Sequence, residues 1–379
     1  MARRTAEKAR RFTKVGYLDL PGGGQVVVRG HLAFVGHMRP PHGTSILDVA
    51  DPARPRLLSQ VTVPEDVHSH KVRVVGEFML VNYERYPPTD TTRSPQVGLK
   101  IFDIGDPSRP REAAFFPTHG RGVHRFDIQG PYAYVSTEWV GFRSNILAIL
   151  DVSNPLHPSV VGRWSLPGQE ASEGEASSRQ PTHYWVHLAL ARGNRVYAAC
   201  GRAGVAIVDV SDPRQPATVG TAQWNPPYTS PTHTFLPIPH PIRNRRFAVV
   251  TDEDVTDEVL EDPPSFMWVL DITHEARPVP VATYHATPRG LVAPGKRFGA
   301  HQPWEHVRDD NIVFVTWFSG GVRAVDISDP YAPSEVGYYV PPRDDVDRVP
   351  QTNDVYVDER GLVYTIDRSR GFHVLAFGR

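Results

Sequence analysis

The chain has 379 residues, with 41 basic and 42 acidic side chains and a formal net charge of −1 at pH 7. This balance gives no electrostatic basis for binding nucleic acid or an anionic membrane surface. The single cysteine, Cys200, excludes an internal disulfide and a thiolate cluster, and no apolar run is long enough to cross a membrane. The basic opening of the chain lacks the apolar centre of a signal peptide, so we expect a cytoplasmic protein.

One phrase recurs along the chain: an aliphatic strand that ends in Asp, followed by a short turn closed by Pro. The full copies occupy residues 45–55, 100–110, 148–158, 206–216, 268–278 and 323–333, and a truncated copy occupies 372–377. Their aspartates are Asp48, Asp103, Asp151, Asp209, Asp271 and Asp326. Because Asp side chains often accept hydrogen bonds from backbone amides in turns, we expect these residues to cap the turn after each strand.

The segment around the copy at 148–158 predicts four short antiparallel strands, since apolar and polar residues alternate between turn signals. These strands occupy residues 124–128, 132–137, 146–153 and 159–166. Hairpins of first and second strands are predicted in the same way at 25–36, 70–82, 187–199, 233–251, 304–316 and 354–366. Four strands in a period of roughly 40–50 residues is the size of a propeller blade.

The two ends of the chain complement each other. The chain ends on a third strand, while its opening at 14–21 is similar to the fourth strands at 161–167 and 336–342. Pairing of the N-terminal strand with the last blade would close the ring and remove exposed edges. The sequence therefore predicts an all-β, seven-bladed β-propeller of four-stranded antiparallel blades, with the N-terminal strand closing the last blade. We expect a basic tail at 1–13 and a single domain over 14–379.

The repeated phrase, with its aliphatic strand, Asp, Pro turn and following Val-Gly, resembles the LVIVD-repeat family of bacterial β-propellers. The resemblance covers nearly the whole chain. It implies the fold, but such repeats occur in proteins of many roles, so the function has to come from the site residues.

Histidines recur at the first residue of the predicted first strands. Aligning the units on their hairpin turns brings His70, His124 and His187 to one position, and His233 joins them if its hairpin turn is longer. His301 lies three residues before the equivalent point. Because the first strand of a propeller blade is innermost, these imidazoles are predicted to converge on the central axis.

Three other histidines compete for places in this ring. His68 lies two residues before His70 on the same strand face, and His183 similarly competes with His187. His306 lies inside a predicted first strand, where it either lines the channel or fills space in the sheet.

Glutamates recur at the end of the predicted second strands, at Glu84, Glu138 and Glu253. Since the second strand returns to the face where the first begins, the glutamates and histidines should share one mouth of the channel. We expect the glutamates to accept the second ring N–H of the imidazoles. The same rim is predicted to carry two acid–base candidates, Tyr83 and Asp252, and four substrate-pocket candidates, His37, Trp139, Trp317 and Arg368.

Neutral imidazoles suit transition metals, and several that converge on an axis can hold one ion and leave a coordination position open. The alternative is that each histidine has only a structural role: it is hydrogen-bonded inside its blade and recurs because the blades arose by duplication. However, a structural histidine should then occur in every blade with similar neighbours, and these five form one arc with different neighbours. The ring therefore predicts one transition-metal ion, with iron favoured over copper, zinc or manganese.

The layout resembles the axial four-histidine iron centre, with its supporting glutamates, of carotenoid-cleaving oxygenases. The arrangement of histidines is also similar to that of copper-binding histidine propellers such as methanethiol oxidase. Neither family's diagnostic motifs are matched, so the resemblance is one of architecture only. It implies redox or oxygen chemistry on a small, partly apolar organic molecule.

We therefore expect a metal-dependent oxidoreductase or oxygenase that acts on a small-molecule substrate. A metal-dependent hydrolase or lyase would use the same site, because a bound ion also acidifies water and polarises carbonyls. A propeller scaffold that binds a protein partner through its face, without catalysis, is the second alternative. The sequence leaves the oligomeric state open.

Overall fold

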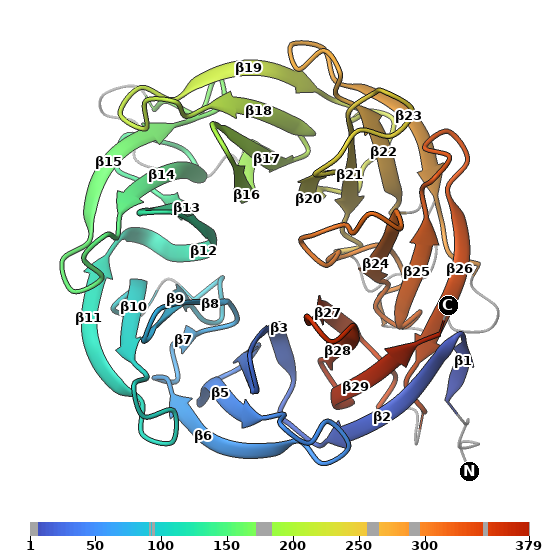
Figure 1. The fold of residues 1–379 in the computed structure, drawn as a ribbon. Coiled ribbons are helices and arrows are strands. Elements are labelled where there is room, and N and C mark those ends of the chain that lie inside the picture. Colours follow the sequence, from blue (N-terminus) through green and yellow to red (C-terminus); the bar gives the residue numbers. More distant parts are fainter. Residues whose placement is uncertain are drawn as a thin grey trace.

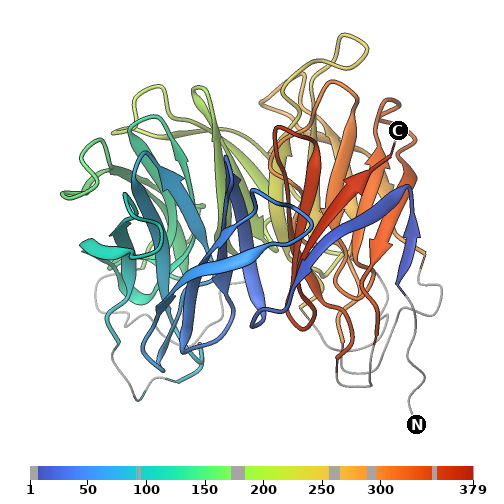
Figure 2. The ribbon, with the colours of Figure 1, turned by 60° about the horizontal axis from the view of Figure 1, so that its bottom comes forward.

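The computed structural model describes residues 7–90, 92, 95–171, 184–255, 265–287, 296–343 and 348–378. Every regular element in these residues is a β-strand, and the sheets are arranged in a ring (Figure 1). Figure 2 shows the ring tilted, with the strands running between its two faces. The predicted all-β, propeller-type fold is confirmed. In the described part of the chain, no helix is long and apolar enough to span a membrane.

Strands follow one another outward from the axis. Those nearest the axis are β3 (Gly23–Arg29), β8 (Val72–Val75), β12 (His119–Gln129), β16 (Tyr184–Arg192), β20 (Thr232–Pro237) and β27 (Thr352–Val357). Next come β4 (Leu32–His37), β9 (Phe78–Arg85), β13 (Tyr132–Glu138), β17 (Arg195–Gly201), β21 (Phe247–Asp252), β24 (Ile312–Thr316) and β28 (Leu362–Asp367).

The outer half of each group is built from the repeated phrase. The third strands are β5 (His42–Asp48), β10 (Gly98–Asp103), β14 (Asn145–Asp151), β18 (Val205–Asp209), β22 (Met267–Asp271), β25 (Val322–Asp326) and β29 (Gly371–Phe377). The fourth strands are β6 (Arg56–Thr62), β11 (Arg111–Pro117), β15 (Ser159–Trp164), β19 (Ala217–Ala222), β23 (Val279–Tyr284) and β26 (Ser334–Val340). The short strand β7 (Val67–His68) pairs with the end of β9.

The N-terminal segment adds two strands to the far end of the chain. β2 (Phe12–Leu18) pairs antiparallel with β29, and β1 (Lys8–Arg10) pairs antiparallel with β26. The expected tail over 1–13 is therefore wrong from residue 8 onward. The physical reason is burial: Phe12 packs against Phe314 and Phe377, with ring centroids 6.0 and 4.9 Å away. The rest of the expected tail, residues 1–6, lies outside the described residues.

The repeated aspartates cap their turns as predicted. In every full copy a carboxylate oxygen accepts the backbone N–H two residues later, at 2.8 or 2.9 Å. The glycine of the phrase has a packing role. An ideal Cβ on Gly162 in β15 would lie 2.0 Å from the carbonyl oxygen of Pro213, which belongs to the turn of the next strand group. The outer strand can therefore approach that turn only without a side chain.

The expected hairpin at 304–316 forms only in its second half, as β24. Its inner edge is made by irregular chain, in which the backbone N–H of His301 donates to the carbonyl of Thr316 at 3.0 Å. Pro303, which lacks an N–H, makes an isolated bridge with Val315. This register brings His301 level with the starts of the other inner strands.

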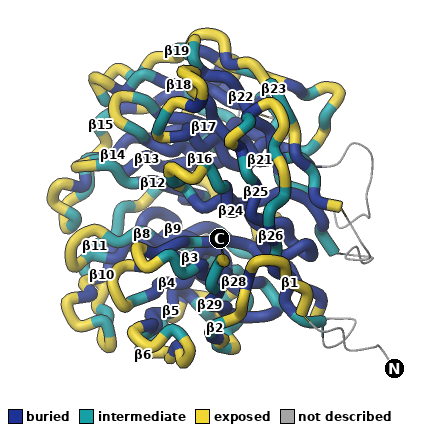
Figure 3. The backbone as a smooth tube through the Cα atoms, turned by 45° about the vertical axis from the view of Figure 1, so that its right-hand side comes forward, coloured by how far each residue is buried: buried dark blue, intermediate teal, exposed yellow. Residues whose placement is uncertain are grey.

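The apolar side chains pack in clusters between neighbouring strand groups. One such cluster joins Leu236 and Val249 with Val313, Val325 and Trp317. Figure 3 shows buried residues concentrated within the ring and exposed residues on the outer turns. The axis itself is lined mainly by polar and charged side chains, which form the site.

Candidate metal centre

Bulges in the innermost strands position the ring side chains. In the β12–β13 pair the register shifts between Val123 and Arg125, which leaves His124 as an extra residue. The same shift leaves His233 as the extra residue in β20 and Asn353 in β27. A bulge bends its strand and re-aims the extra side chain, here toward the axis.

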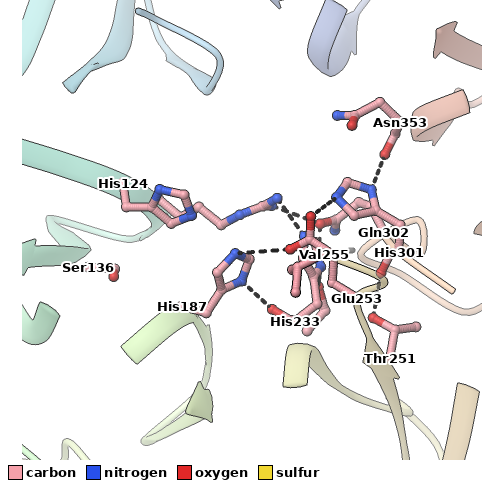
Figure 4. A network of polar contacts seen from close by, with 12 residues as sticks. His124, Ser136, His187, His233, Thr251, Glu253, Val255, His301, Gln302 and Asn353 are labelled. Carbon is pink, nitrogen blue, oxygen red and sulfur yellow. Dashed lines mark hydrogen bonds and ion pairs between the residues drawn. The ribbon is translucent and has the colours of Figure 1, made fainter. Parts of the chain in front are cut away.

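The structure brings the five predicted histidines together in one arc. The ring centroids of His124 lie 5.3 Å from those of His70 and 4.8 Å from those of His187. Those of His233 lie 4.3 Å from His187 and 4.1 Å from His301. Figure 4 shows four of these imidazoles from close by.

The arc ends where a histidine has no room or no counterpart. At β3 the equivalent residue is Gly24, and an added Cβ would lie 2.6 Å from the Cβ of His70. On the other side the ring of Phe318 follows His301, with centroids 4.6 Å apart. The Gly24 backbone therefore makes the space into which His70 fits.

Two imidazoles are held by backbone carbonyls. Nδ1 of His187 lies 2.7 Å from the carbonyl oxygen of His233, and Nδ1 of His301 lies 2.6 Å from that of Asn353 (Figure 4). Because a carbonyl oxygen can only accept, Nδ1 carries the proton in both rings and the Nε2 lone pairs remain available. Metal-binding histidines commonly use this arrangement.

Glu84 holds two further imidazoles. Its carboxylate lies 2.8 Å from Nε2 of His68 and 2.9 Å from Nδ1 of His124, and Arg121 lies 3.3 Å away. Burial alone would raise the pKa of Glu84, but its contacts with His124 and His68 outweigh burial and keep that pKa well below its usual range. Glu84 therefore has the predicted role of orienting an imidazole.

His70 and His233 are bonded differently. The amide nitrogen of Asn82 donates to Nδ1 of His70 at 3.2 Å, because the amide oxygen is taken by the backbone N–H of Lys71. The guanidinium of Arg125 donates to Nε2 of His233 at 2.6 Å. In this arrangement His70 carries its proton on Nε2, and the Nε2 lone pair of His233 is already used.

Glu253 brings a carboxylate to the free nitrogens. Its oxygens lie 4.0 Å from Nε2 of His187 and 3.7 Å from Nε2 of His301, and Figure 4 shows it between these two rings. Arg297 also contacts this carboxylate, at 3.0 Å. Glu253, predicted as a support for the imidazoles, is therefore placed as a candidate ligand.

Two groups of side chains have the spacing needed to hold an ion. His187, His233 and Glu253 each offer one ligand atom within 4.8 Å of the others. The second group contains His68, His70 and Glu84. An ion that used Nε2 of His233 would have to replace the contact that Arg125 makes with it.

The ring imidazoles are held neutral. Burial lowers the pKa of all five ring histidines, and the nearby Arg125 charge lowers those of His187 and His233 further. At His124 the carboxylate of Glu84 works against burial, but the pKa is still lowered. Neutral imidazoles at pH 7 are the form that binds metal.

Both acid–base candidates point away from the ring. Tyr83 lies in a hydrophobic core, with Nζ of Lys100 4.8 Å from its ring centroid. Asp252 is fully buried and accepts a hydrogen bond from Nε1 of Trp268 at 2.6 Å, and burial raises its pKa to about 7. Each residue directly precedes a glutamate that faces the ring, and neighbouring side chains on a strand face opposite ways.

Two predicted pocket residues are structural. Trp317 is completely buried and packs edge-on against Tyr284. His37 is also buried, and Nε2 of its ring lies 2.8 Å from the hydroxyl of Ser45. Burial lowers the pKa of His37 to about 4.

The remaining rim predictions divide between the ring and the surface. Arg368 lies beside the ring, since it donates to the side-chain oxygen of Asn353 at 2.6 Å and lies over Phe318. Trp139 instead contacts His119 and lies under the Arg163 guanidinium.

The third predicted glutamate and the three histidines that competed for places in the ring lie in different surroundings. Glu138, the third predicted support, accepts the backbone N–H of Arg121 at 3.1 Å and has no contact with a ring histidine among the described contacts. His68 joins the arc, with its ring centroid 4.5 Å from that of His70. His306 is exposed, and His183 lies outside the described residues.

Sequence reasoning missed the charged layer next to the ring. Arg125 crosses the axis to Gln302, whose side-chain oxygen lies 2.9 Å from the guanidinium. Lys71 is buried nearby, and its charge and that of Arg125 act on each other. The available signal was a basic residue directly after two of the ring histidines, at His70 and His124.

Comparisons with known proteins agree on the fold. The LVIVD repeat model matches residues 120–165, 190–223 and 310–340. The WD40 repeats of RRP9 superpose with a TM-score of 0.61 at 12% identity, covering 99% of both chains. The WD40 propeller domain of Doa1 gives 0.60 at 9% identity, covering 96% of both chains. The computationally designed Ika8 protein gives 0.55 at 9% identity, covering 95% of this chain and 98% of the other. No curated protein matches this sequence. The chain therefore contains LVIVD repeats and has a β-propeller fold.

Proposed function

We propose that this chain is a metal-dependent enzyme, with one transition-metal ion at the histidine ring beside Glu253. The proposed class of reaction is redox or oxygen chemistry on a small organic substrate. The observation that carries the proposal is the pair His187 and His301, whose free Nε2 atoms lie 4.0 and 3.7 Å from the same carboxylate.

The donor set favours iron. Two imidazoles and one carboxylate form the ligand set of non-haem iron oxygenases, in which the remaining positions stay open. Such an ion would supply a site for oxygen and substrate. Copper, zinc and manganese also bind imidazole and carboxylate. We favour iron because two histidines and one carboxylate are the typical ligand set of non-haem iron oxygenases.

This chain's own residues would orient the ligands and shape the site. The carbonyls of His233 and Asn353 fix the tautomers of His187 and His301. Phe318 is fully buried beside His301, and the guanidinium groups of Arg297 and Arg368 lie 5.6 and 5.2 Å from the centroid of its ring. Tyr83 and Asp252 are not proposed as acid or base, because they face away.

The fold around this site is proposed in finer detail as seven blades. Each consecutive strand group carries one copy of the repeated phrase, and the pairing of β2 with β29 gives the last group an outer strand.

Elemental analysis of the purified protein tests the metal centre. We expect about one iron per chain, and loss of at least about 90% of it in the double variant His187→Ala/His301→Ala, because both free Nε2 donors are removed. The matched control is His31→Ala/His306→Ala, which removes two exposed histidines remote from the ring. Stoichiometric metal in the first variant, with an unchanged β-sheet circular dichroism spectrum, would refute the ligand assignment.

The metal found also separates the alternatives. Zinc or manganese would favour the hydrolase or lyase, in which the ion acidifies bound water or polarises a carbonyl. A protein without metal would favour the non-catalytic scaffold. One observation supports that last alternative: the Arg125 guanidinium, 2.6 Å from Nε2 of His233, places a positive charge where a cation would bind.

A further inference from the structure

Two buried basic side chains beside the histidine ring, Lys71 and Arg125, have no carboxylate in contact, and burial lowers the pKa of both. The side chain of Arg125 is 4% exposed and donates only to neutral acceptors, Gln302 and His233, while its Nε has no partner. Lys71 is 2% exposed, and its Nζ has no hydrogen-bond partner. Among the described residues, neither side chain forms an ion pair.

Unpaired buried charges are costly, because they lose hydration without gaining a counter-charge. The same axial region shows what a satisfied cation looks like. Arg73 lies 2.6 Å from a Glu305 oxygen and 3.4 Å from an Asp127 oxygen. Lys71 and Arg125 lack such partners among the described residues, which indicates that their free hydrogen-bond donors are available to a ligand.

The carboxylates whose charges act on these two side chains are engaged elsewhere. Asp354 accepts the backbone N–H groups of Val26 and Val355, at 3.1 and 2.8 Å. Glu305 is paired with Arg73, and Glu253 with Arg297. Asp354 and Glu305 act on Lys71, and Glu253 acts most strongly on Arg125, through charge and not through a hydrogen bond. They leave the Nζ donors unfilled, and they would repel a ligand that carries more than one negative charge.

We propose that Lys71 and Arg125 bind a small monoanion, the carboxylate group of an organic acid. Identifying that acid as the substrate rests on the proposed function, whereas the anion site itself does not. A single negative charge fits because it satisfies two cations while Asp354 and Glu305 limit the total. Ammonium and guanidinium groups are the usual protein donors to a carboxylate.

A cavity of about 320 Å³ lies beside this site and is lined by Gln25, Arg73, Glu305, Asp354 and Tyr356, among others. It reaches the two carboxylates whose charges act on Lys71. Lys71 and Arg125 do not line it, so a carboxylate that reached them from this cavity would have to displace side chains at its wall.

The anion and the metal should assist each other. A carboxylate that engages Arg125 would neutralise the charge beside His233 and weaken the guanidinium's hold on Nε2 of that ring. Anion binding would then favour cation binding at the ring, and by linkage the metal would favour the anion equally.

The test uses acetate as the probe, with the protein as purified and, in parallel, after chelation. Calorimetric titration in chloride-free buffer at constant ionic strength should show saturable binding of acetate to both samples. Lys71→Met should weaken acetate binding at least tenfold, since a charge-assisted hydrogen bond is lost. In anion-free buffer it should melt no lower than the wild type, because no partner is left unpaired. Phosphate and chloride form the comparison arms.

The control variant replaces a lysine away from the axis, and three results would overturn the proposal. Lys100→Met, which removes a lysine that pairs with Glu112 away from the axis, should bind acetate like the wild type. Equal acetate affinity in Lys71→Met, tighter binding of phosphate, or a lower melting temperature of Lys71→Met without anions would overturn the proposal. The last result would indicate a Lys71–Asp354 ion pair. If Lys71→Met does not fold, Lys71→Gln serves the same comparison. If the protein as purified contains no metal and still binds acetate, the metal centre is refuted and the anion site stands.

Discussion

Two polar layers lie along the axis of this ring, and they differ in how their charges are satisfied. In the layer nearer the β3–β4 turn, Arg73 and Arg192 share Asp127, at 3.4 and 3.0 Å, and Arg73 also binds Glu305. In the layer at the ring, Arg125 and Lys71 form no ion pair with any described residue. The first layer pairs its charges within the chain, whereas the second does not do so among the residues that the structure describes.

This difference separates stability from function. Paired buried charges hold neighbouring strand groups in register, and removing one partner leaves the other unpaired. Free Nε2 atoms and unfilled cationic donors contribute little to folding but can bind ligands. Perturbed, incompletely satisfied groups tend to mark functional sites, and this is the reason that we propose the ring as the functional site.

Acid should destabilise the fold through its buried neutral histidines, and this is the largest effect we expect. His37 and His373, the latter buried in β29, lie outside the ring, and burial lowers their pKa values to about 4, from 6.5 when unfolded. The unfolded chain therefore binds more protons between these values. Stability is therefore present above pH 6.5 and is lost toward pH 4, at about 1.4 kcal/mol per histidine and pH unit. The ring histidines shift in the same direction and add to the loss.

Two buried aspartates oppose this loss. Burial raises the pKa of Asp252 and of Asp354 to about 7, so they stabilise the folded chain as pH falls below 7. The histidines outnumber them, and the net free energy of unfolding should fall by several kcal/mol between pH 6.5 and 4.5. Urea unfolding across this range, with chelator present, measures it. A stability that stays constant or rises on acidification would contradict the assignment of buried neutral imidazoles.

Breaking the paired layer should be the next largest effect. Arg73→Met removes the partner of Glu305 and one partner of Asp127, and we expect a loss of about 3–5 kcal/mol in the free energy of unfolding. Chemical denaturation measures this loss. The conservatively matched Arg56→Met, which removes an exposed partner of Asp48, should cost at most about 1 kcal/mol. Equal losses in the free energy of unfolding of both variants would show that the buried ion pairs of Arg73 stabilise the fold no more than an exposed ion pair does.

Removing the ring carboxylate should have the smallest effect on folding and a selective effect on metal. Glu253→Gln keeps the size of the side chain but removes a charged ligand, so metal affinity should fall about 10- to 100-fold. Competition with a chromogenic chelator measures the affinity. Glu138→Gln is the matched control, since Glu138 accepts only a backbone N–H among the described contacts. A similar loss in both variants would place the effect outside the ring.

Local patterns were enough to predict much of this molecule. The Asp-turn-Pro phrase predicted the capped turns, because an Asp carboxylate reaches the amide two residues later whatever surrounds it. Aligning hairpin turns brought His70, His124, His187, His233 and His301 to one level, because repeated units place equivalent residues at equivalent positions.

Strand alternation also explains where the rim prediction was wrong. Once Glu84 and Glu253 face the ring, the residues directly before them, Tyr83 and Asp252, must face the neighbouring core. Their position next to these glutamates in the sequence did not indicate which way their own side chains point. Trp317 was misplaced for a related reason, since its large apolar surface is buried against the next strand group.

By itself the sequence determined the repeat, the strands, the capped turns and the arc of histidines. The strands and capped turns depend on contacts a few residues apart, and the arc follows because repeated units place equivalent residues at equivalent positions. The tertiary structure alone decided which ring nitrogens are free, because their partners, such as the carbonyls of His233 and Asn353, come from other strand groups. It also decided that Arg125 lies on the axis beside His124. Strict alternation would direct these neighbours to opposite faces, and the bulge at His124 adds one residue and directs both inward.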